Sequence, residues 1–153
     1  MTVPHHSHVA IKELYDYWRS VSPCGELPGR QHIDPIDLAP LLPNIWLLEV
    51  HREPLRFWRR LVGTSIEAFA EGNLTGGWLH DKLNDDNFDE VQKALIEVVE
   101  TKTPSWRRGK PAISNHKSEA ELERIYLPLA TDGETVDMIL ALTVVLKNPI
   151  TRN

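Results

Sequence analysis

Residues 56–79 read RFWRRLVGTSIEAFAEGNLTGGWL, and the pattern of this stretch changes at Val62-Gly63-Thr64. The aromatic and apolar residues before Gly63 predict a β-strand over residues 55–62, which the glycine ends. Thr64 is followed three positions later by Glu67, the spacing of a helix capping box, so we expect a short helix that stops at Gly72. The chain is therefore predicted to leave a sheet here and to enter a set of helical pieces.

The segment upstream predicts one more strand and a helical lead-in. Residues 44–51, NIWLLEVH, alternate apolar and polar side chains as a half-buried strand does. Residues 7–21 predict an amphipathic helix. The apolar strip expected on this helix consists of Val9, Leu14, Tyr17, Trp18 and Val21. After a linker rich in proline and glycine, Asp34-Pro35 predicts a short helix that ends before Pro43.

The segment downstream predicts a long helix and three strands. Residues 86–102 have the helical period, and their expected buried strip is Phe88, Val91, Leu95, Val98 and Val99. Residues 104–117 predict a weak edge strand because the segment contains proline. Residues 121–131 and 134–147 predict two longer strands, and Asp132-Gly133 between them predicts a tight hairpin.

Strands in this order, joined by short turns, predict an α+β fold. We expect a five-stranded antiparallel sheet with the intervening helices on one face, preceded by an N-terminal amphipathic helix. The expected organisation is a helical lead-in with a wrapping linker over residues 1–43, one domain over residues 44–147, and a tail over residues 148–153.

Length and charge limit the class of protein. The chain has 153 residues, the size of one domain with an ordinary core. Its net charge of −5 and pI near 5.8 argue against binding to a nucleic-acid backbone. It has no signal-peptide pattern and no apolar run long enough for a membrane span, so we expect a cytoplasmic protein. The single cysteine, Cys24, is expected to be a free thiol.

The ordered set of segments resembles the PAS-domain family of short alphaproteobacterial proteins. The segments that carry the resemblance are LPGRQHIDPIDLAPLLP, NIWLLEV, RFWRRLVGTSIEAF, NLTGGWL, TPSW and ERIYLPLATDGETVDMILA. They cover about residues 10–147. The resemblance implies a sheet whose helical side encloses a small-molecule cavity, and a role in sensing or partner binding instead of turnover.

The resemblance also bears on cofactors. Flavin photosensors of this family need a cysteine beside an asparagine on a helix, but Cys24 precedes the first strand. Haem-binding members use a histidine on the long helix, and residues 86–102 contain none, with His80 the nearest substitute. Neither flavin nor haem is therefore expected, and the identity of a cofactor stays open. We expect no metal site, since His5, His6 and His8 are interpreted as solvated residues of the terminus.

Apolar residues of the strands are the candidates for lining the cavity. Those on the sheet are Trp46, Leu48, Phe57 or Trp58, Tyr126 and Met138, and those closing the cavity from above are Phe69 and Trp78. The same aromatic residues are also suited to fill a core without a ligand.

Arg59 and Arg60 are adjacent strand residues, so one of them should face the helices. A buried arginine needs a partner. We assign Arg60 to the candidate site and keep two roles for it, a structural ion pair with Glu123 or Asp137 and the binding of an anionic ligand.

Three functions remain open at this stage. The first is a stand-alone cytoplasmic signalling module that binds a small molecule or a signalling protein partner. The second is a ligand-free dimerisation or adaptor domain with a pocket filled by aromatic side chains. The third is a small enzyme, for which the sequence offers no acid/base pair, so we expect no catalysis. A homodimer through the N-terminal helix is expected from its apolar residues Leu14, Tyr17 and Trp18.

Overall fold

The computed structural model describes residues 3–70, 73–79, 85–109 and 121–146. The elements in these residues are, in chain order, α1 (Val9–Ser20), η1 (Arg30–His32), η2 (Ala39–Asn44), β1 (Ile45–His51), β2 (Arg56–Val62), α2 (Thr64–Ala70), α3 (Asp85–Thr101), β3 (Ser105–Gly109), β4 (Leu122–Leu129) and β5 (Met138–Val145). The strands form one antiparallel sheet in the order β2-β1-β5-β4-β3. The predicted α+β fold is confirmed, and β3 lies at an edge as expected.

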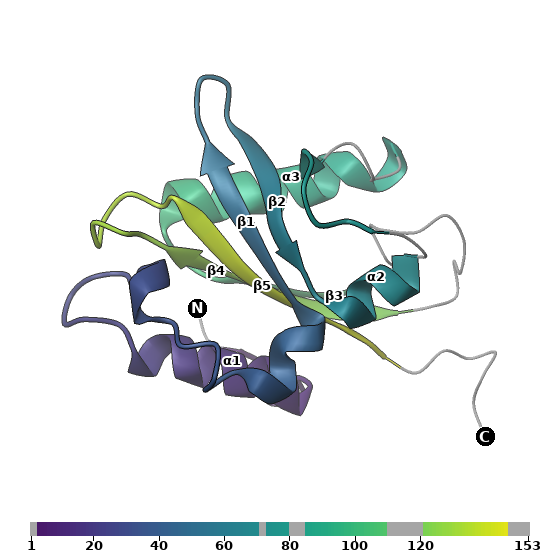
Figure 1. Cartoon of the computed structure of the whole chain (residues 1–153), viewed down its shortest axis with the longest axis horizontal. Helices are drawn as coiled ribbons and strands as arrows, with labels where there is room; N and C mark the ends of the chain where they lie inside the picture. Colours follow the sequence, from purple (N-terminus) through teal and green to yellow (C-terminus); the bar gives the residue numbers. More distant parts are fainter. Residues whose placement is uncertain (1–2, 71–72, 80–84, 110–120, 147–153) are drawn as a thin grey trace.

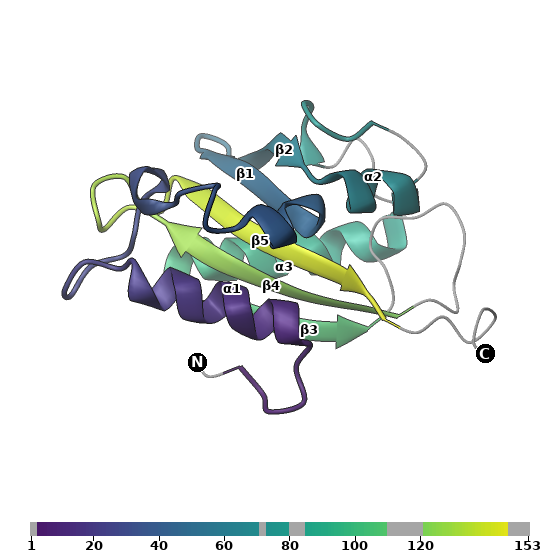
Figure 2. The ribbon, with the colours of Figure 1, turned by 60° about the horizontal axis from the view of Figure 1, so that its bottom comes forward.

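The sheet lies between two helical layers (Figures 1 and 2). We call the face covered by α1 the α1 face; its buried side chains include Ile125, Leu127, Leu140 and Leu142. The opposite face, covered by α3 and α2, is the α3 face; its buried side chains include Leu48, Phe57, Ile139 and Ala141. The helices between β2 and β3 thus cover one face, as predicted, and the N-terminal helix covers the other.

The buried side of α1 differs from the predicted strip. Leu14 and Trp18 are buried as expected, but the other buried residues are Ala10, Ile11 and Tyr15. Val9 is 63% exposed, because residues 11, 14, 15 and 18 already form the contiguous stripe that packs on the sheet. The Trp18 indole donates a hydrogen bond of 2.9 Å to the Pro128 carbonyl, which fixes α1 on β4.

A buried carboxylate fixes the start of α1 on the sheet. Glu123 of β4 lies on the α1 face and is fully buried. Its oxygens accept hydrogen bonds from the His8 backbone N–H at 3.0 Å, the Trp106 indole at 2.7 Å and the Arg108 guanidinium at 3.2 Å. The His8 ring in turn accepts from the Ala10 N–H. His8 therefore acts as the N-cap of α1, where the sequence predicted only a solvated residue.

Gly63 explains the break in residues 56–79. A Cβ atom at this position would lie 2.2 Å from the Pro43 carbonyl oxygen, so only glycine allows η2 to pack on the end of β2. The Gly63 N–H donates to the Ile45 carbonyl at 2.7 Å, which joins the end of β2 to the start of β1. The strand therefore ends where predicted, and α2 begins immediately after it.

Three local predictions are wrong in detail. The helix expected before Pro43 is a 3-10 helix that contains Pro43, because a 3-10 helix this short loses only one bond at a proline. Glu67 does not complete a capping box, since its carboxylate accepts from the Leu74 and Thr75 N–H groups. The Asp-Gly turn forms, but β4 already ends at Leu129 and β5 begins only at Met138, because Val136 between them packs into the core of the α3 face.

Some expectations fall outside the described residues. These are the helix stop at Gly72, the side chains of Phe69 and Phe88, His80, the end of the third predicted strand, and the C-terminal tail. Within the described ranges, no helix has both the length and the apolar character needed to cross a bilayer.

Candidate functional site

Polar side chains cross the α3 face of the sheet in one row. Thr143 of β5 lies directly opposite Arg124 of β4, and Arg124 lies directly opposite Arg107 of β3. These residues share the α3 face because strand side chains alternate and the flanking Glu123 and Ile125 face α1. This part of a helix-covered face therefore carries two neighbouring cations.

The two arginines of this row differ in how they are neutralised. Arg107 forms an ion pair with Glu90 of α3. Arg124 is half-buried, and its Nη1 donates to the Ser105 carbonyl at 3.2 Å and to the Ser105 hydroxyl at 3.1 Å. Its guanidinium carbon lies 4.0 Å from the centre of the Tyr126 ring. Within the described residues, no carboxylate lies within ion-pair distance of Arg124.

The electrostatic environment of Arg124 disfavours its positive charge. Burial lowers the pKa of the guanidinium, Tyr126 raises it, and the charge of Arg107 lowers it again, with a net lowering. Arginine still stays protonated at neutral pH. The lowered pKa therefore indicates that, among the described residues, desolvation of the guanidinium outweighs the favourable contact with Tyr126.

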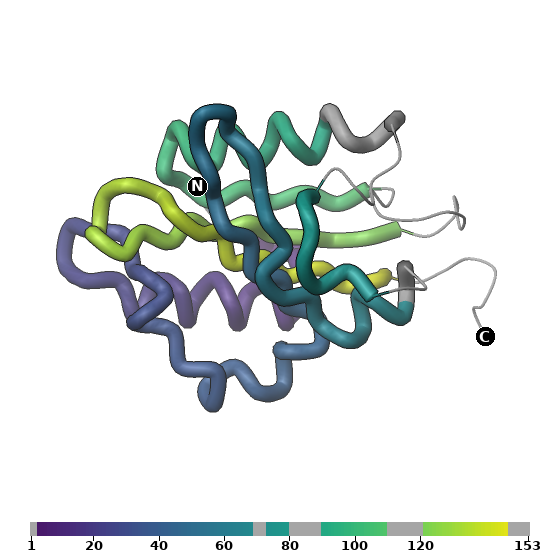
Figure 3. Tube along the Cα trace, turned by 45° about the horizontal axis from the view of Figure 1, so that its top comes forward, coloured from purple at the N-terminus to yellow at the C-terminus, as the bar shows by residue number. Residues whose placement is uncertain are grey.

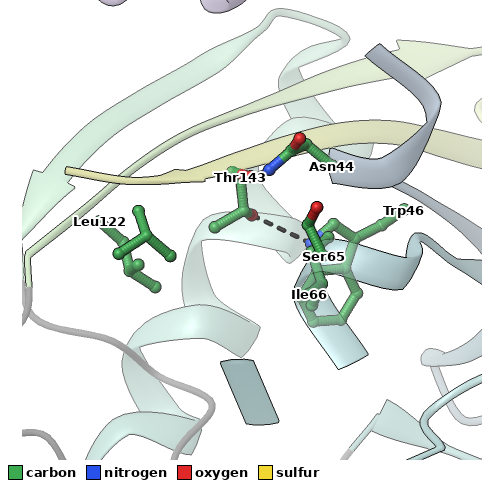
Figure 4. A pocket seen from close by; sticks show the side chains of 7 residues that line it. Asn44, Trp46, Ser65, Ile66, Leu122 and Thr143 are labelled. Carbon is green, nitrogen blue, oxygen red and sulfur yellow. Dashed lines mark hydrogen bonds between the residues drawn. The ribbon is translucent and has the colours of Figure 1, made fainter. Parts of the chain in front are cut away.

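A recess lies beside this row (Figure 4). Its volume is about 20 Å³, room for one water molecule. The residues that line it are Asn44, Trp46, Ser65, Ile66, Leu122, Thr143 and Val145. The Trp46 indole donates to the Thr143 hydroxyl at 3.0 Å. Because Thr143 is opposite Arg124 in the sheet, the recess and the arginine occupy neighbouring strands of the α3 face.

The structure places four predicted lining residues on the α3 face. Trp46, Leu48 and Phe57 are buried there, and Tyr126 packs against them from β4. Met138 does not belong to this group. It packs with Leu140 and Leu142 against the α1 face, and Ile139 takes the position expected for it.

Trp58 and Trp78 lie at the edge of the sheet that β2 forms, where Trp58 of β2 makes a bridge with Trp78. Trp58 pairs with Glu49, whereas Phe57 pairs with Val50, so Phe57 is the inward member of the predicted alternatives. The Trp58 and Trp78 rings meet edge to face, with centroids 5.0 Å apart. Arg56 lies over the Trp78 ring at 4.1 Å, and His51 meets that ring at 5.2 Å. We call Glu49, His51, Arg56, Trp58 and Trp78 the hairpin cluster.

The inward arginine of the adjacent pair is Arg59, which is 3% exposed. Its guanidinium donates to the carbonyls of Leu74, Gly76, Trp78 and Leu79. Two backbone hydrogen bonds also join Arg59 to Gly76 and Gly77, so residues 73–79 run alongside β2 (Figure 3). Arg59 therefore fixes the turn that follows α2.

Arg60 points away from the α3 face. Its Nη1 lies 3.3 Å from Glu49 Oε2, and its side chain is 63% exposed. The partners expected for it, Glu123 and Asp137, are wrong, because β1 and β5 separate β2 from Glu123 on β4 and Arg60 pairs with Glu49 instead. A β-bulge between Leu47 and Leu48 leaves Arg60 as an extra residue of β2. Arg60 therefore does not belong to the candidate site on the α3 face.

Arg124 and Thr143 were missed by reasoning from sequence alone. One signal was present, since Glu123-Arg124 places two adjacent charges inside the apolar strand LERIYLPL. Adjacent strand residues face opposite sides, so each covered face must receive one of these charges.

Comparisons with known proteins agree with this architecture. A family model described as PAS domain matches residues 6–144 of the chain. Among solved structures, the chain is similar to the crystal structure of a sensory box sensor histidine kinase from Vibrio cholerae, with 12% identity, a TM-score of 0.50, and coverage of 73% of this chain and 88% of that one. At this identity the similarity concerns the fold alone. A comparison with curated proteins found no match.

Proposed function

The chain belongs to the PAS domain family, and from this premise we propose that it is a cytoplasmic signalling module that senses a small molecule bound on its α3 face. The observation that carries the proposal is the row of polar groups beside the recess. Thr143 and Arg124 are hydrogen-bonding groups on a covered face, and ligand sites combine an apolar lining with a few such groups.

The size of the recess suggests how binding is transmitted. A small-molecule site usually has a volume of about 300–1,000 Å³, whereas this recess has about 20 Å³. A ligand therefore has to displace part of the wall, and Ser65 and Ile66 of α2 form that wall. α2 follows the end of β2 that lies away from the hairpin between β1 and β2 (Figure 1). Residues 73–79, which come after α2 in the sequence, run back along β2 to Trp78, and through them a displacement of α2 reaches the hairpin cluster.

The hairpin cluster is the surface that we propose contacts a signalling partner. Tryptophan and arginine are enriched among the residues that dominate protein interfaces. Trp58 and Trp78 are half-buried, and Arg56 is exposed. Both tryptophans adjoin the turn that Arg59 fixes to β2.

A homodimer through α1 stays a prediction. Of the three residues that motivated it, Leu14 and Trp18 are buried against the sheet of the same chain, and Tyr17 is half-buried and donates a hydrogen bond to Asp37. The most exposed residue of the predicted strip is Val9, while Val21 is half-buried like Tyr17. Light scattering of a Val9→Glu variant tests the prediction, because a dimer through α1 should dissociate.

A ligand-free adaptor domain is the second candidate function, favoured by the small recess and by Trp46, which is only 6% exposed. Native mass spectrometry of the full chain, followed by denaturation, separates the two. A small molecule that leaves the protein on denaturation supports sensing. A chain whose mass equals that of the polypeptide, and whose melting temperature no small molecule raises, supports the adaptor.

A further inference from the structure

Building on the proposed function, we infer that the ligand of the α3 face is a small organic carboxylic acid whose carboxylate is bound by the Arg124 guanidinium. The first argument is charge. A partly buried cation is stabilised by a counter-charge, and the described residues provide none to the half-buried Arg124 while they provide Glu90 to its neighbour Arg107. Arg124 and Arg107 are also like charges directly opposite each other in the sheet, which is unfavourable. An anion bound here would offset both the desolvation of Arg124 and its repulsion by Arg107.

The second argument is geometry. A guanidinium carries five N–H donors in a planar fork. Ser105 uses Nη1, and the Tyr126 ring covers one side of the plane. Nε and Nη2 form no hydrogen bond within the described residues, so one edge of the fork is available. Two parallel N–H groups match the two oxygens of a carboxylate.

The third argument concerns the rest of the ligand. The Thr143 hydroxyl lies opposite Arg124 and borders the recess. Beyond it the lining is apolar, with Trp46, Ile66 and Leu122. Arg124 itself does not line the recess, because Ser105 and Tyr126 hold its guanidinium on the β3 side of β4. A molecule with an anionic end at Arg124 therefore has to extend past Thr143 for its apolar or aromatic body to reach Trp46, whereas a free phosphate leaves the apolar part unused.

The test compares acids with their neutral amides. Melting temperatures of the full chain are measured with acetate, succinate, benzoate and phenylacetate, and with the corresponding amides. At a concentration of 100 times Kd, a bound acid raises the melting temperature by about 5–10 °C. We expect at least one acid to do so and its amide to have no such effect.

Variants connect the effect to the arginine. Arg124→Met is expected to weaken binding of that acid about 10- to 100-fold, as measured by titration calorimetry. Arg124→Lys keeps the charge but loses the planar fork of N–H donors, so its affinity for the acid should lie between that of the wild type and that of Arg124→Met. Arg60→Met removes a surface arginine of the same chain and should bind like the wild type.

The outcomes separate this inference from the proposed function. Amides that stabilise the protein as well as acids, or acid binding that survives Arg124→Met, overturn the carboxylate inference and leave sensing intact. Stabilisation by inorganic phosphate but by no carboxylic acid also overturns it. If no compound of the panel stabilises the wild type and native mass spectrometry finds no bound molecule, both fail.

Discussion

Glu123 and Arg124 are neighbours on β4 and carry opposite charges to opposite faces of the sheet. On the α1 face, Glu123 is fully buried and accepts hydrogen bonds from His8, Trp106 and Arg108. On the α3 face, Arg124 is half-buried, and among the described residues its partners are Ser105 and the Tyr126 ring. The difference indicates that a buried charge which joins structural elements, as Glu123 joins α1, β3 and β4, receives its hydrogen-bond partners from the same chain. Arg124, which no carboxylate of the described residues neutralises, is the charge on which the ligand inference rests.

Arg59 supports this interpretation from a second position. It is more buried than Arg124, yet four backbone carbonyls of residues 74–79 accept hydrogen bonds from it. Its role is to hold that turn on β2. Burial alone therefore does not distinguish a structural cation from a ligand-binding one; the partners do.

The largest effect is expected for Glu123→Gln. Removing one member of a buried ion pair costs about 3–5 kcal/mol, and we expect about 3 kcal/mol here because Arg108 retains some access to water. Urea unfolding followed by tryptophan fluorescence measures the loss. Glu121→Gln, at an exposed position directly before the same strand, is the control and should change stability little. A loss below about 1 kcal/mol for Glu123→Gln would contradict the structural role assigned to Glu123 on the α1 face.

The stability contributed by Glu123 should also depend on pH. Burial raises the pKa of this carboxyl, but the hydrogen bonds from Trp106, His8 and Arg108 and the charge of Arg108 outweigh burial and lower it below its ordinary value of 4.5. The unfolded chain then binds a proton more readily than the folded one. The stabilisation is therefore complete above pH 4.5 and disappears as the pH falls through the lowered pKa.

This dependence is measured as the difference in unfolding free energy between wild type and Glu123→Gln at a series of pH values. We expect the difference to be constant near neutral pH and to shrink in acid. A difference that grows in acid has the wrong sign and contradicts the assignment.

Arg59→Met is expected to destabilise the protein by about 2 kcal/mol, because carbonyls that accepted charged hydrogen bonds lose their donor. The turn at residues 74–79 should become more sensitive to proteolysis. Arg60→Met is the matched control, since an exposed pair such as Arg60 and Glu49 contributes less than about 1 kcal/mol. Equal losses in the two variants would show that the turn is held by its backbone bonds alone.

The order and type of the elements could be predicted because turns, caps and periodicity are local. The faces of individual residues could not always be predicted. In β5, MILALTVV is apolar on both sides, since helices cover both faces of the sheet, and alternation gives no signal there. Met138 was assigned to the wrong face for this reason.

The assignment of Arg60 to the candidate site was wrong for a different reason. A β-bulge opposite Leu47 and Leu48 inserts Arg60 as an extra residue, so both Arg60 and Leu61 are exposed and the inward pattern resumes only at Val62. No residue of the strand identifies the bulge in advance. The hypothesis of an anion-binding arginine on the α3 face therefore moves from Arg60 to Arg124.

The smallest effect is expected for Arg124→Met in the unliganded protein. The substitution loses the hydrogen bonds to Ser105 and the contact with Tyr126, but it also removes a half-buried cation opposite Arg107. Replacing a poorly compensated buried charge by an apolar side chain of similar length is often neutral or stabilising. The two contributions oppose each other, so we expect the free energy of unfolding to change by less than about 1 kcal/mol.

The same urea experiment on Glu123→Gln and Arg124→Met then tests the comparison between the two faces directly. If Arg124→Met costs as much as Glu123→Gln, Arg124 has a structural counter-charge, and the two neighbours are equivalent. If it costs little, the chain does not need the guanidinium for folding. In that case a role other than folding has to explain why the chain has a partly buried guanidinium at position 124. A ligand that stabilises the wild type but not Arg124→Met would show that this role is ligand binding.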